Sequence, residues 1–254
     1  MSKKKIIIGN WKMNPLTLKE GEKLFADISK QVKIFKKTEL VICPPYLYLE
    51  KLKKISKKIN LGAQNGYPGD VGASTGEVSL GMLNTLGVKY VILGHSERRM
   101  LGEVNADINK KIKSTLFYKM TPILCVGEST RDENHEYLNF IKTQIEECLQ
   151  GLTKISLSQV VIAYEPVWAI GKDATRVATP AEFLEISIFI KKILSDKFGK
   201  LATEDLRIIY GGSVHPENAL SFLVEGKAEG FLPGRDSLNV KKFLEIIKIT
   251  ENTK

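Results

Sequence analysis

The sequence predicts an α/β fold in which eight parallel strands alternate with helices and close into a (β/α)8 barrel. Short runs rich in β-branched residues alternate with longer amphipathic stretches from one end of the chain to the other. Eight such runs share the 254 residues, which leaves about 32 residues for each unit of strand, helix and turns. Strict alternation favours a parallel sheet covered by helices, and eight units favour closure over an open, doubly wound sheet. We therefore expect one barrel domain spanning residues 1–254.

The predicted strands are near-continuous apolar runs, as expected for strands that are buried on both faces. In chain order they lie at 5–9, 39–43, 59–63, 90–94, 121–126, 160–164, 206–210 and 229–232. After the first strand, apolar residues recur at spacings of three, four and seven between Gly21 and Phe35. This pattern predicts a helix with one apolar face over that stretch.

A second helix is predicted after the sixth strand, where the apolar residues between Phe183 and Leu194 repeat the helical spacing. Its start is marked in the sequence. Thr179 suits the N-cap, Pro180 suits the first helical position, and Glu182 completes a capping box.

Composition excludes several classes of protein. With 43% hydrophobic and 26% charged residues the chain is an ordinary globular one, and no stretch approaches the roughly 18 apolar residues of a membrane span or suggests a signal peptide. Three scattered cysteines, Cys43, Cys125 and Cys148, argue against a disulfide framework and against a metal site, so we expect a cytoplasmic location. The net charge of +9 is dispersed over helical segments, which favours a solvated outer face over a nucleic-acid interface.

In a barrel of this kind the active site lies at the carboxyl ends of the strands. Polar or glycine-rich residues follow seven of the eight predicted strands, at 10–12, 64–65, 95–97, 127–128, 165–166, 211–213 and 233–235. These ends meet at one rim, so one lysine, one histidine and one glutamate converge there.

Three of these residues suggest acid–base chemistry. A helix that begins after His95 would direct backbone N–H groups at the ring and keep it neutral, so that it can donate a hydrogen bond. Glu165 ends an apolar strand and suits a general base, while Lys12 supplies a positive charge. Structural roles stay open as alternatives, namely a buried hydrogen-bonded histidine and a salt bridge for the glutamate.

Glycines follow the sixth, seventh and eighth predicted strands, at Gly171, at Gly211 and Gly212, and at Gly234. Each one alone is explained by a tight turn. Together they place backbone N–H groups at the rim where barrels frequently bind phosphate, which predicts a phosphorylated small molecule as the ligand.

Five motifs in fixed order resemble the triosephosphate isomerase family. They are GNWKMN at 9–14, GHSERR at 94–99, CVGE at 125–128, AYEPVWAIG at 163–171 and YGGSV at 210–214. The resemblance covers the whole chain. It implies the TIM barrel, the interconversion of dihydroxyacetone phosphate and D-glyceraldehyde 3-phosphate in glycolysis and gluconeogenesis, and a reaction without cofactor or metal. It also implies that Glu165 shuttles a proton through an ene-diol(ate) while neutral His95 polarises the carbonyl group.

The same resemblance assigns the remaining site residues. Lys12 and Asn10 would stabilise the developing negative charge, with Glu97 holding Lys12 and Ser96 holding the resting base. The phosphate would be bound by backbone N–H groups, with two supporting residues behind them, and these are Gly171, Ser213, Gly234 and Arg235, then Tyr210 and Gly212.

Two loops complete the picture that the resemblance implies. The segment from Pro166 onward corresponds to a closing lid that excludes water. The loop 64–77, which contains GAQN at 62–65 and STGE at 74–77, implies a homodimer in which Thr75 reaches the other active site beside Lys12. The loop is long, rich in glycine and poor in apolar residues, as expected of a segment that needs a partner.

The sequence departs from the family pattern in three places. The lid is about two residues longer between Gly171 and Thr179, the stretch after Arg99 is one residue short, and the phosphate loop reads LPGRDS at 232–237, with an arginine in place of one of two glycines. Three alternatives follow: another phosphate-binding barrel enzyme, a catalytically weak relative, and a basic RNA-binding or scaffold protein. An isomerase assay separates them.

Overall fold

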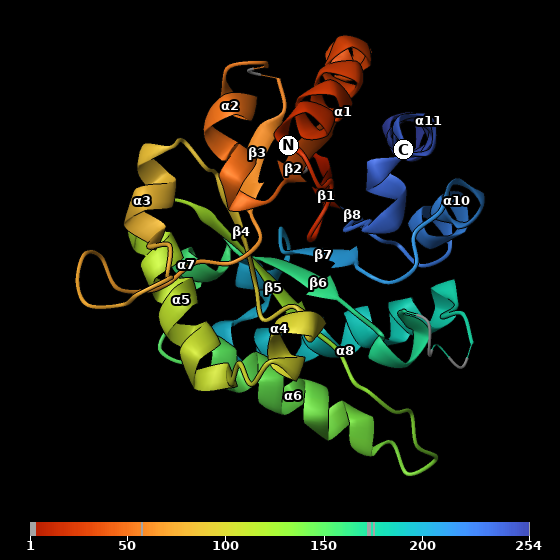
Figure 1. The fold of residues 1–254 in the computed structure, drawn as a ribbon. Helices are drawn as coiled ribbons and strands as arrows, with labels where there is room; N and C mark the ends of the chain where they lie inside the picture. The colour runs from red at the N-terminus through yellow and green to blue at the C-terminus, as the bar shows by residue number, and fades with distance from the viewer. Residues whose placement is uncertain (1–3, 57, 172–173, 175, 254) are drawn as a thin grey trace.

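The computed structural model describes residues 4–56, 58–171, 174 and 176–253, over which eight parallel strands close into a barrel with each strand beside its neighbours in sequence (Figure 1). The strands are β1 (Lys5–Asn10), β2 (Thr38–Cys43), β3 (Asn60–Ala63), β4 (Tyr90–Leu93), β5 (Thr121–Val126), β6 (Val161–Tyr164), β7 (Arg207–Tyr210) and β8 (Gly230–Phe231). β1 pairs with both β2 and β8, which closes the ring. The predicted fold class is confirmed.

The predicted strands all occur, with ends that differ by one or two residues. β8 differs most, since it contains two residues where four were predicted. The predicted ends still bond to the neighbouring strand: the N–H of Glu229 donates to the carbonyl of Ile208 over 3.1 Å, and that of Leu232 to Tyr210 over 2.9 Å. The extended pairing therefore continues beyond the regular strand.

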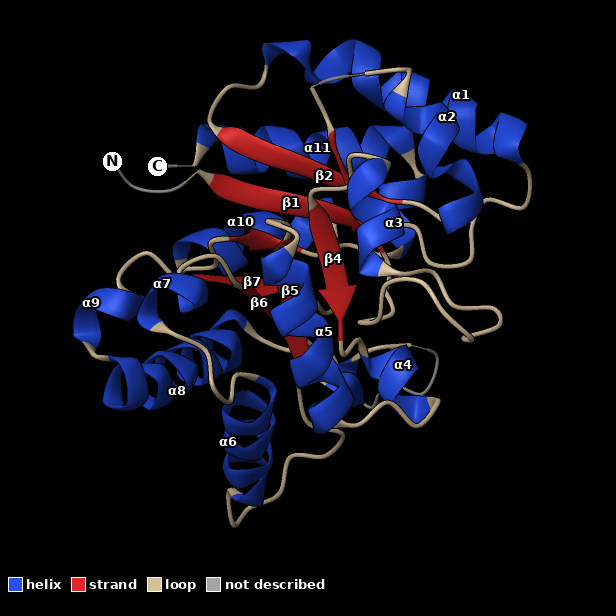
Figure 2. Cartoon of the chain, turned by 90° about the vertical axis from the view of Figure 1, so that its left-hand side faces the viewer, coloured by secondary structure: helices blue, strands red, loops and turns tan. Residues whose placement is uncertain are grey.

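Helices surround the red strands on the outside of the barrel in Figure 2. In the described residues they are α1 (Leu18–Gln31), α2 (Leu49–Lys53), α3 (Leu80–Thr85), α4 (Ser96–Met100), α5 (Asn105–Phe117), α6 (Glu136–Cys148), α7 (Lys154–Leu157), α8 (Pro180–Phe198), α9 (Lys200–Thr203), α10 (Pro216–Val224) and α11 (Val240–Asn252). Short 3₁₀ helices are η1 (Val32–Ile34), η2 (Tyr46–Tyr48), η3 (Val167–Ala169) and η4 (Arg235–Leu238). No helix of the described residues is long and apolar enough to cross a membrane.

The first predicted helix differs at both ends. It begins at Leu18, because Thr17 and Glu20 form a capping box that the spacing of apolar residues did not reveal. It ends at Gln31, and Phe35 lies beyond η1 in extended backbone, so the prediction of a helix through Phe35 was wrong. Phe35 still packs against the core, which explains why the apolar spacing continued past the end of the helix.

The start of α8 is confirmed as predicted. The N–H of Thr179 donates to Oε2 of Glu182 over 2.8 Å, and the N–H of Glu182 donates to Oγ1 of Thr179 over 3.3 Å. This reciprocal pair satisfies backbone donors that the first turn of a helix leaves free.

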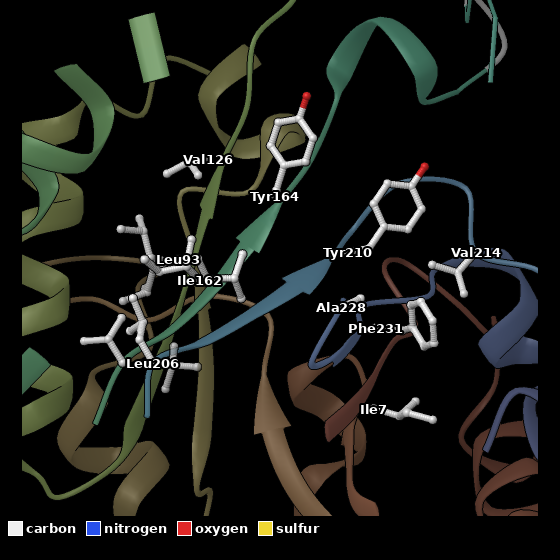
Figure 3. Close-up of a cluster of buried hydrophobic side chains, with 14 of the residues drawn as sticks. Ile7, Leu93, Val126, Ile162, Tyr164, Leu206, Tyr210, Val214, Ala228 and Phe231 are labelled. Carbon is white, nitrogen blue, oxygen red and sulfur yellow. The ribbon is translucent and has the colours of Figure 1, made fainter. Parts of the chain in front are cut away.

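Alternate strand residues build two separate cores. Inward side chains such as Ile6, Ile8 and Ile92 fill the barrel, while outward ones such as Ile7 pack against the helices. Figure 3 shows part of the outer core, where Tyr164 and Tyr210 stand on β6 and β7. Because side chains fill the interior, a ligand can reach the barrel only at its ends.

The amino-terminal end of the barrel is closed by a polar cluster. Glu39 accepts a hydrogen bond from the hydroxyl of Tyr90, one from Nδ2 of Asn60 over 3.2 Å, and an ion pair from Arg207 over 2.7 Å. The Arg207 side chain is only 12% exposed, so its charge depends on this carboxylate. Chemistry is thereby confined to the opposite rim.

We expect Glu39→Ala to lower the free energy of unfolding by about 3 kcal/mol, because it leaves Arg207 buried without its ion pair. Urea unfolding followed by circular dichroism measures the change. The control is Glu50→Ala, which removes an exposed pair with Lys54 and should change the free energy by less than about 0.5 kcal/mol. Equal effects of the two substitutions would contradict this account.

Candidate active site

The carboxyl ends of β1, β4, β6, β7 and β8 surround a pocket of about 650 Å³. Most of the predicted site residues line it, namely Asn10, Lys12, His95, Ser96, Glu97, Gly171, Gly212, Ser213, Gly234 and Arg235. The predicted candidates after β3 and β5, at 64–65 and 127–128, do not. Glu165 and Tyr210 also lie behind the lining residues and are buried.

Lys12 is held over the pocket by its neighbours. Its Nζ lies 2.7 Å from Oε1 of Glu97, and its N–H donates to Oδ1 of Asn10 over 3.1 Å. The backbone of Lys12 has a φ of 53°, a left-handed conformation that costs free energy in a residue other than glycine. Gln64 stabilises it by donating from Nε2 to the Lys12 carbonyl over 2.7 Å. Gln64 thus supports the site from outside the pocket.

The tautomer of His95 follows from its surroundings. His95 precedes α4, and its Nδ1 accepts the N–H of Glu97 over 3.2 Å. A ring nitrogen that accepts a hydrogen bond carries no proton, so a neutral ring carries its proton on Nε2. Nε2 lies 3.2 Å from Oε1 of Glu165. The arrangement presents a neutral imidazole with a donor available at Nε2.

Glu165 is a buried carboxylate, 2% exposed, at the end of β6. Its Oε2 accepts the backbone N–H of Ser96 over 3.0 Å. Two glycines provide the space it occupies: a Cβ at Gly127 would overlap the Glu165 carbonyl, and one at Gly211 would lie 3.0 Å from Cγ. The sequence motifs that contain these glycines are therefore required by the volume of the glutamate.

A thiol lies directly beneath this carboxylate. Cys125 is fully buried inside the barrel, and burial together with the adjacent Glu165 raises the pKa of its thiol. Cys43 and Cys148 are also free and buried. Burial raises the pKa of Cys148 to about 11.

The loops after β7 and β8 form the other end of the pocket. Gly212 lies against the hydroxyl of Tyr210, which a Cβ at this position would overlap. Gly234 lies beside Lys12, since a Cβ there would be 3.2 Å from Cε of the lysine. Arg235 has an exposed side chain, and Gly171 has a φ of 88° that favours glycine. The glycines thus bring backbone close to the Lys12 ammonium group.

Glu128 is a functional residue whose role the sequence did not reveal. It follows β5, but its side chain turns away from the pocket and is buried. Its Oε1 accepts from the hydroxyl of Tyr164 over 2.7 Å, from Nε1 of Trp168 over 2.8 Å and from Nε of Arg131 over 3.3 Å. Buried tyrosine and tryptophan need such partners, and this need was the available signal. Glu128 thereby holds η3, the first turn after Glu165.

A second contact holds Trp168 from outside. The Arg176 guanidinium lies 4.2 Å from the centre of the Trp168 ring, and its Nη1 donates to Oε2 of Glu182 over 3.0 Å. Burial alone would raise the pKa of Glu182, but hydrogen bonds from Arg176 and Thr179 lower it to about 2. Positions 172, 173 and 175 of the predicted longer lid lie outside the described residues.

Comparison with known proteins agrees with this geometry. The triosephosphate isomerase family model matches residues 5–250. The triosephosphate isomerase of Cytophaga hutchinsonii is 40% identical over 97% of this chain and 99% of its own. That of Alkaliphilus metalliredigens is 42% identical over 96% of this chain and 99% of its own. Because both the family model and these relatives match nearly from end to end, the chain belongs to the triosephosphate isomerase family.

Proposed function

We propose that this chain interconverts dihydroxyacetone phosphate and D-glyceraldehyde 3-phosphate, as the names of its relatives indicate. The observation that carries the proposal is the meeting of a buried carboxylate with a neutral imidazole. Glu165 and His95 lie 3.2 Å apart at one rim, with the Lys12 ammonium bound to Glu97 two residues from His95. This set can move protons between adjacent carbons and oxygens without any redox chemistry.

In the proposed reaction Glu165 removes a proton from the carbon next to the carbonyl group. The electron pair moves to the carbonyl oxygen and forms an ene-diol(ate), and Glu165 then returns the proton to the neighbouring carbon. Atoms and electrons are conserved, so the product is an isomer. To reach the substrate the carboxylate leaves its bond with the Ser96 N–H, which supports a resting role for that contact.

His95 and Lys12 would act on the substrate oxygens. The Nε2–H of His95 donates to the oxygen on which charge develops, and the ring carries protons between the two oxygens. The Lys12 ammonium and the Asn10 amide stabilise the same negative charge. The strained φ of Lys12 supports this role, because strain of this kind is retained where a side chain must hold one position.

Backbone N–H groups at Gly171, Ser213, Gly234 and Arg235 would bind the phosphate. The pocket is lined by all four residues, and the approach of Gly234 to Lys12 supports an anion there. With this substrate the protein would act in glycolysis and gluconeogenesis in the cytoplasm.

We also propose a homodimer formed through the loop 64–77. This loop projects from the barrel between β3 and α3 in Figure 1, and Val71 in it is 88% exposed. Met13 and Leu16, which follow β1 at the same rim, are 94% and 92% exposed. Apolar side chains gathered at one rim indicate a protein contact, and a second subunit would place Thr75 near Lys12 of its partner.

Glu165→Asp tests the base. It withdraws the carboxylate by about one bond length, and a misplacement of about 1 Å costs on the order of a hundredfold in rate. We expect kcat to fall by about this factor, with KM within about twofold, in a steady-state assay coupled to a dehydrogenase. Glu245→Asp, at an exposed position of α11, is the matched control. An unchanged kcat would exclude Glu165 as the base.

Arg235→Ala distinguishes backbone from side-chain binding of phosphate. An alanine retains the N–H, so backbone binding predicts a KM change of about twofold, as for one screened surface charge. A bidentate guanidinium clamp would instead raise KM by more than about tenfold. We expect the smaller effect, with Lys241→Ala as a control for the loss of one exposed cation.

The dimer is tested by sedimentation. At micromolar concentration we expect a mass of about twice the 28.4 kDa of the chain. Val71→Arg places a charge in the proposed contact and should shift the protein toward monomer with loss of activity. Leu201→Arg, at an 85% exposed position on α9, should leave both unchanged. A fully active wild-type monomer would contradict the proposal.

A further inference from the structure

Asp236 is a buried carboxylate beside the pocket, 3% exposed, in the position where the family pattern expects a small residue. It is the second residue of η4, the short helix that follows the β8 loop. Its Oδ2 lies 2.7 Å from Nδ1 of His215, and its Oδ1 lies 3.5 Å from Nζ of Lys242 on α11. Because a carboxylate only accepts hydrogen bonds, Nδ1 of His215 is the donor.

His215 connects this carboxylate to the loop after β7. Its backbone N–H donates to Oδ1 of Asn218 over 2.9 Å, and Nδ2 of Asn218 donates to the carbonyl of Ser213 over 2.8 Å. Ser213 and His215 are therefore held in one hydrogen-bonded turn at the start of α10. Any constraint on the His215 side chain acts on the position of Ser213.

On the other side, η4 holds the loop after β8. Both the N–H and the hydroxyl of Ser237 donate to the carbonyl of Gly234, over 3.0 and 2.6 Å. Asp236 lies between Gly234 and Ser237 in this turn. The bond from His215 to Asp236 thus joins the turn that contains Ser213 to the turn that contains Gly234.

The sheet itself joins these two loops weakly. In the described residues the register between β7 and β8 consists of one pair, Tyr210 and Phe231, with the bond from Leu232 to Tyr210 beyond it. The loops that follow diverge toward α10 and α11, whose ribbons lie side by side in Figure 1. A side-chain bond across the gap fixes a separation that the ladder leaves free.

We propose that His215 and Asp236 are positioning residues for phosphate, and that their hydrogen bond sets the distance between the backbone N–H groups of Ser213 and Gly234. The inference rests on the proposed function for the identity of the anion. Neither residue is assigned a contact with substrate. Their role is to keep two loops at the spacing that one phosphate group requires.

Electrostatics gives the proposal a distinctive sign. A carboxylate next to an anion pocket repels a phosphate dianion, so charge alone predicts tighter binding when Asp236 is removed. The positioning role predicts weaker binding, because the loops lose their connection. The two accounts therefore predict opposite changes for the same substitution.

The test measures binding of inorganic phosphate by calorimetry, together with KM and kcat, for Asp236→Ala and Asp236→Asn. We expect the alanine to weaken phosphate binding and raise KM by about five- to tenfold, with kcat within about twofold, as for one lost hydrogen bond. Asparagine retains an acceptor for His215 and should keep phosphate affinity within about twofold of wild type. Asp196→Ala, at an exposed position of α8, is the control.

His215 gives an independent test from the more exposed side, since its side chain is 40% exposed. Asn at this position keeps a donor where Nδ1 lies, so His215→Asn should retain phosphate affinity and His215→Ala should lose it by the same five- to tenfold. Tight phosphate binding by both alanine variants, or equal weakening by alanine and asparagine, would overturn the proposal. Calorimetry does not depend on turnover, so a wild-type protein that lacks isomerase activity would refute the proposed function separately.

Discussion

Closure of the parallel sheet is the constraint on which the rest of the molecule depends. Because all strands run in one direction and the last pairs with the first, their carboxyl ends share one rim. Residues far apart in the chain are thereby brought into contact, as in the ion pair of Lys12 with Glu97. A packed interior and the polar cluster around Glu39 close the remaining volume, so the barrel holds its chemistry at one end.

The site combines flexible glycine with strongly constrained side chains. Space for the buried Glu165 comes from Gly127 and Gly211, and the orientation of His95 comes from a backbone N–H group. Lys12 retains a left-handed backbone that its neighbours stabilise. Each acid–base group is thus positioned by backbone, which does not ionise and moves less than side chains do. Such an arrangement favours a fixed electrostatic environment for the transition state.

Much of this could be predicted from the sequence, because apolar periodicity identifies buried strands and the strand ends must share a rim. The strands and the start of α8 follow from local patterns. Other features depend on contacts between distant segments. Glu128 follows a strand, as a pocket residue would, yet buried Tyr164 and Trp168 draw it away. The bond between His215 and Asp236 joins two loops whose separation no local pattern encodes.

The burial of all three cysteines gives the thiols a kinetic meaning. Thiolates are the reactive form of cysteine, and burial raises the pKa of Cys125 and Cys148 in the folded chain. Oxidants and alkylating reagents in water therefore act on these residues only when the barrel opens. Cys43 and Cys125 lie inside the ring of strands, so their modification records separation of the strands themselves. The protein carries, within its own core, an internal record of how often the barrel unfolds.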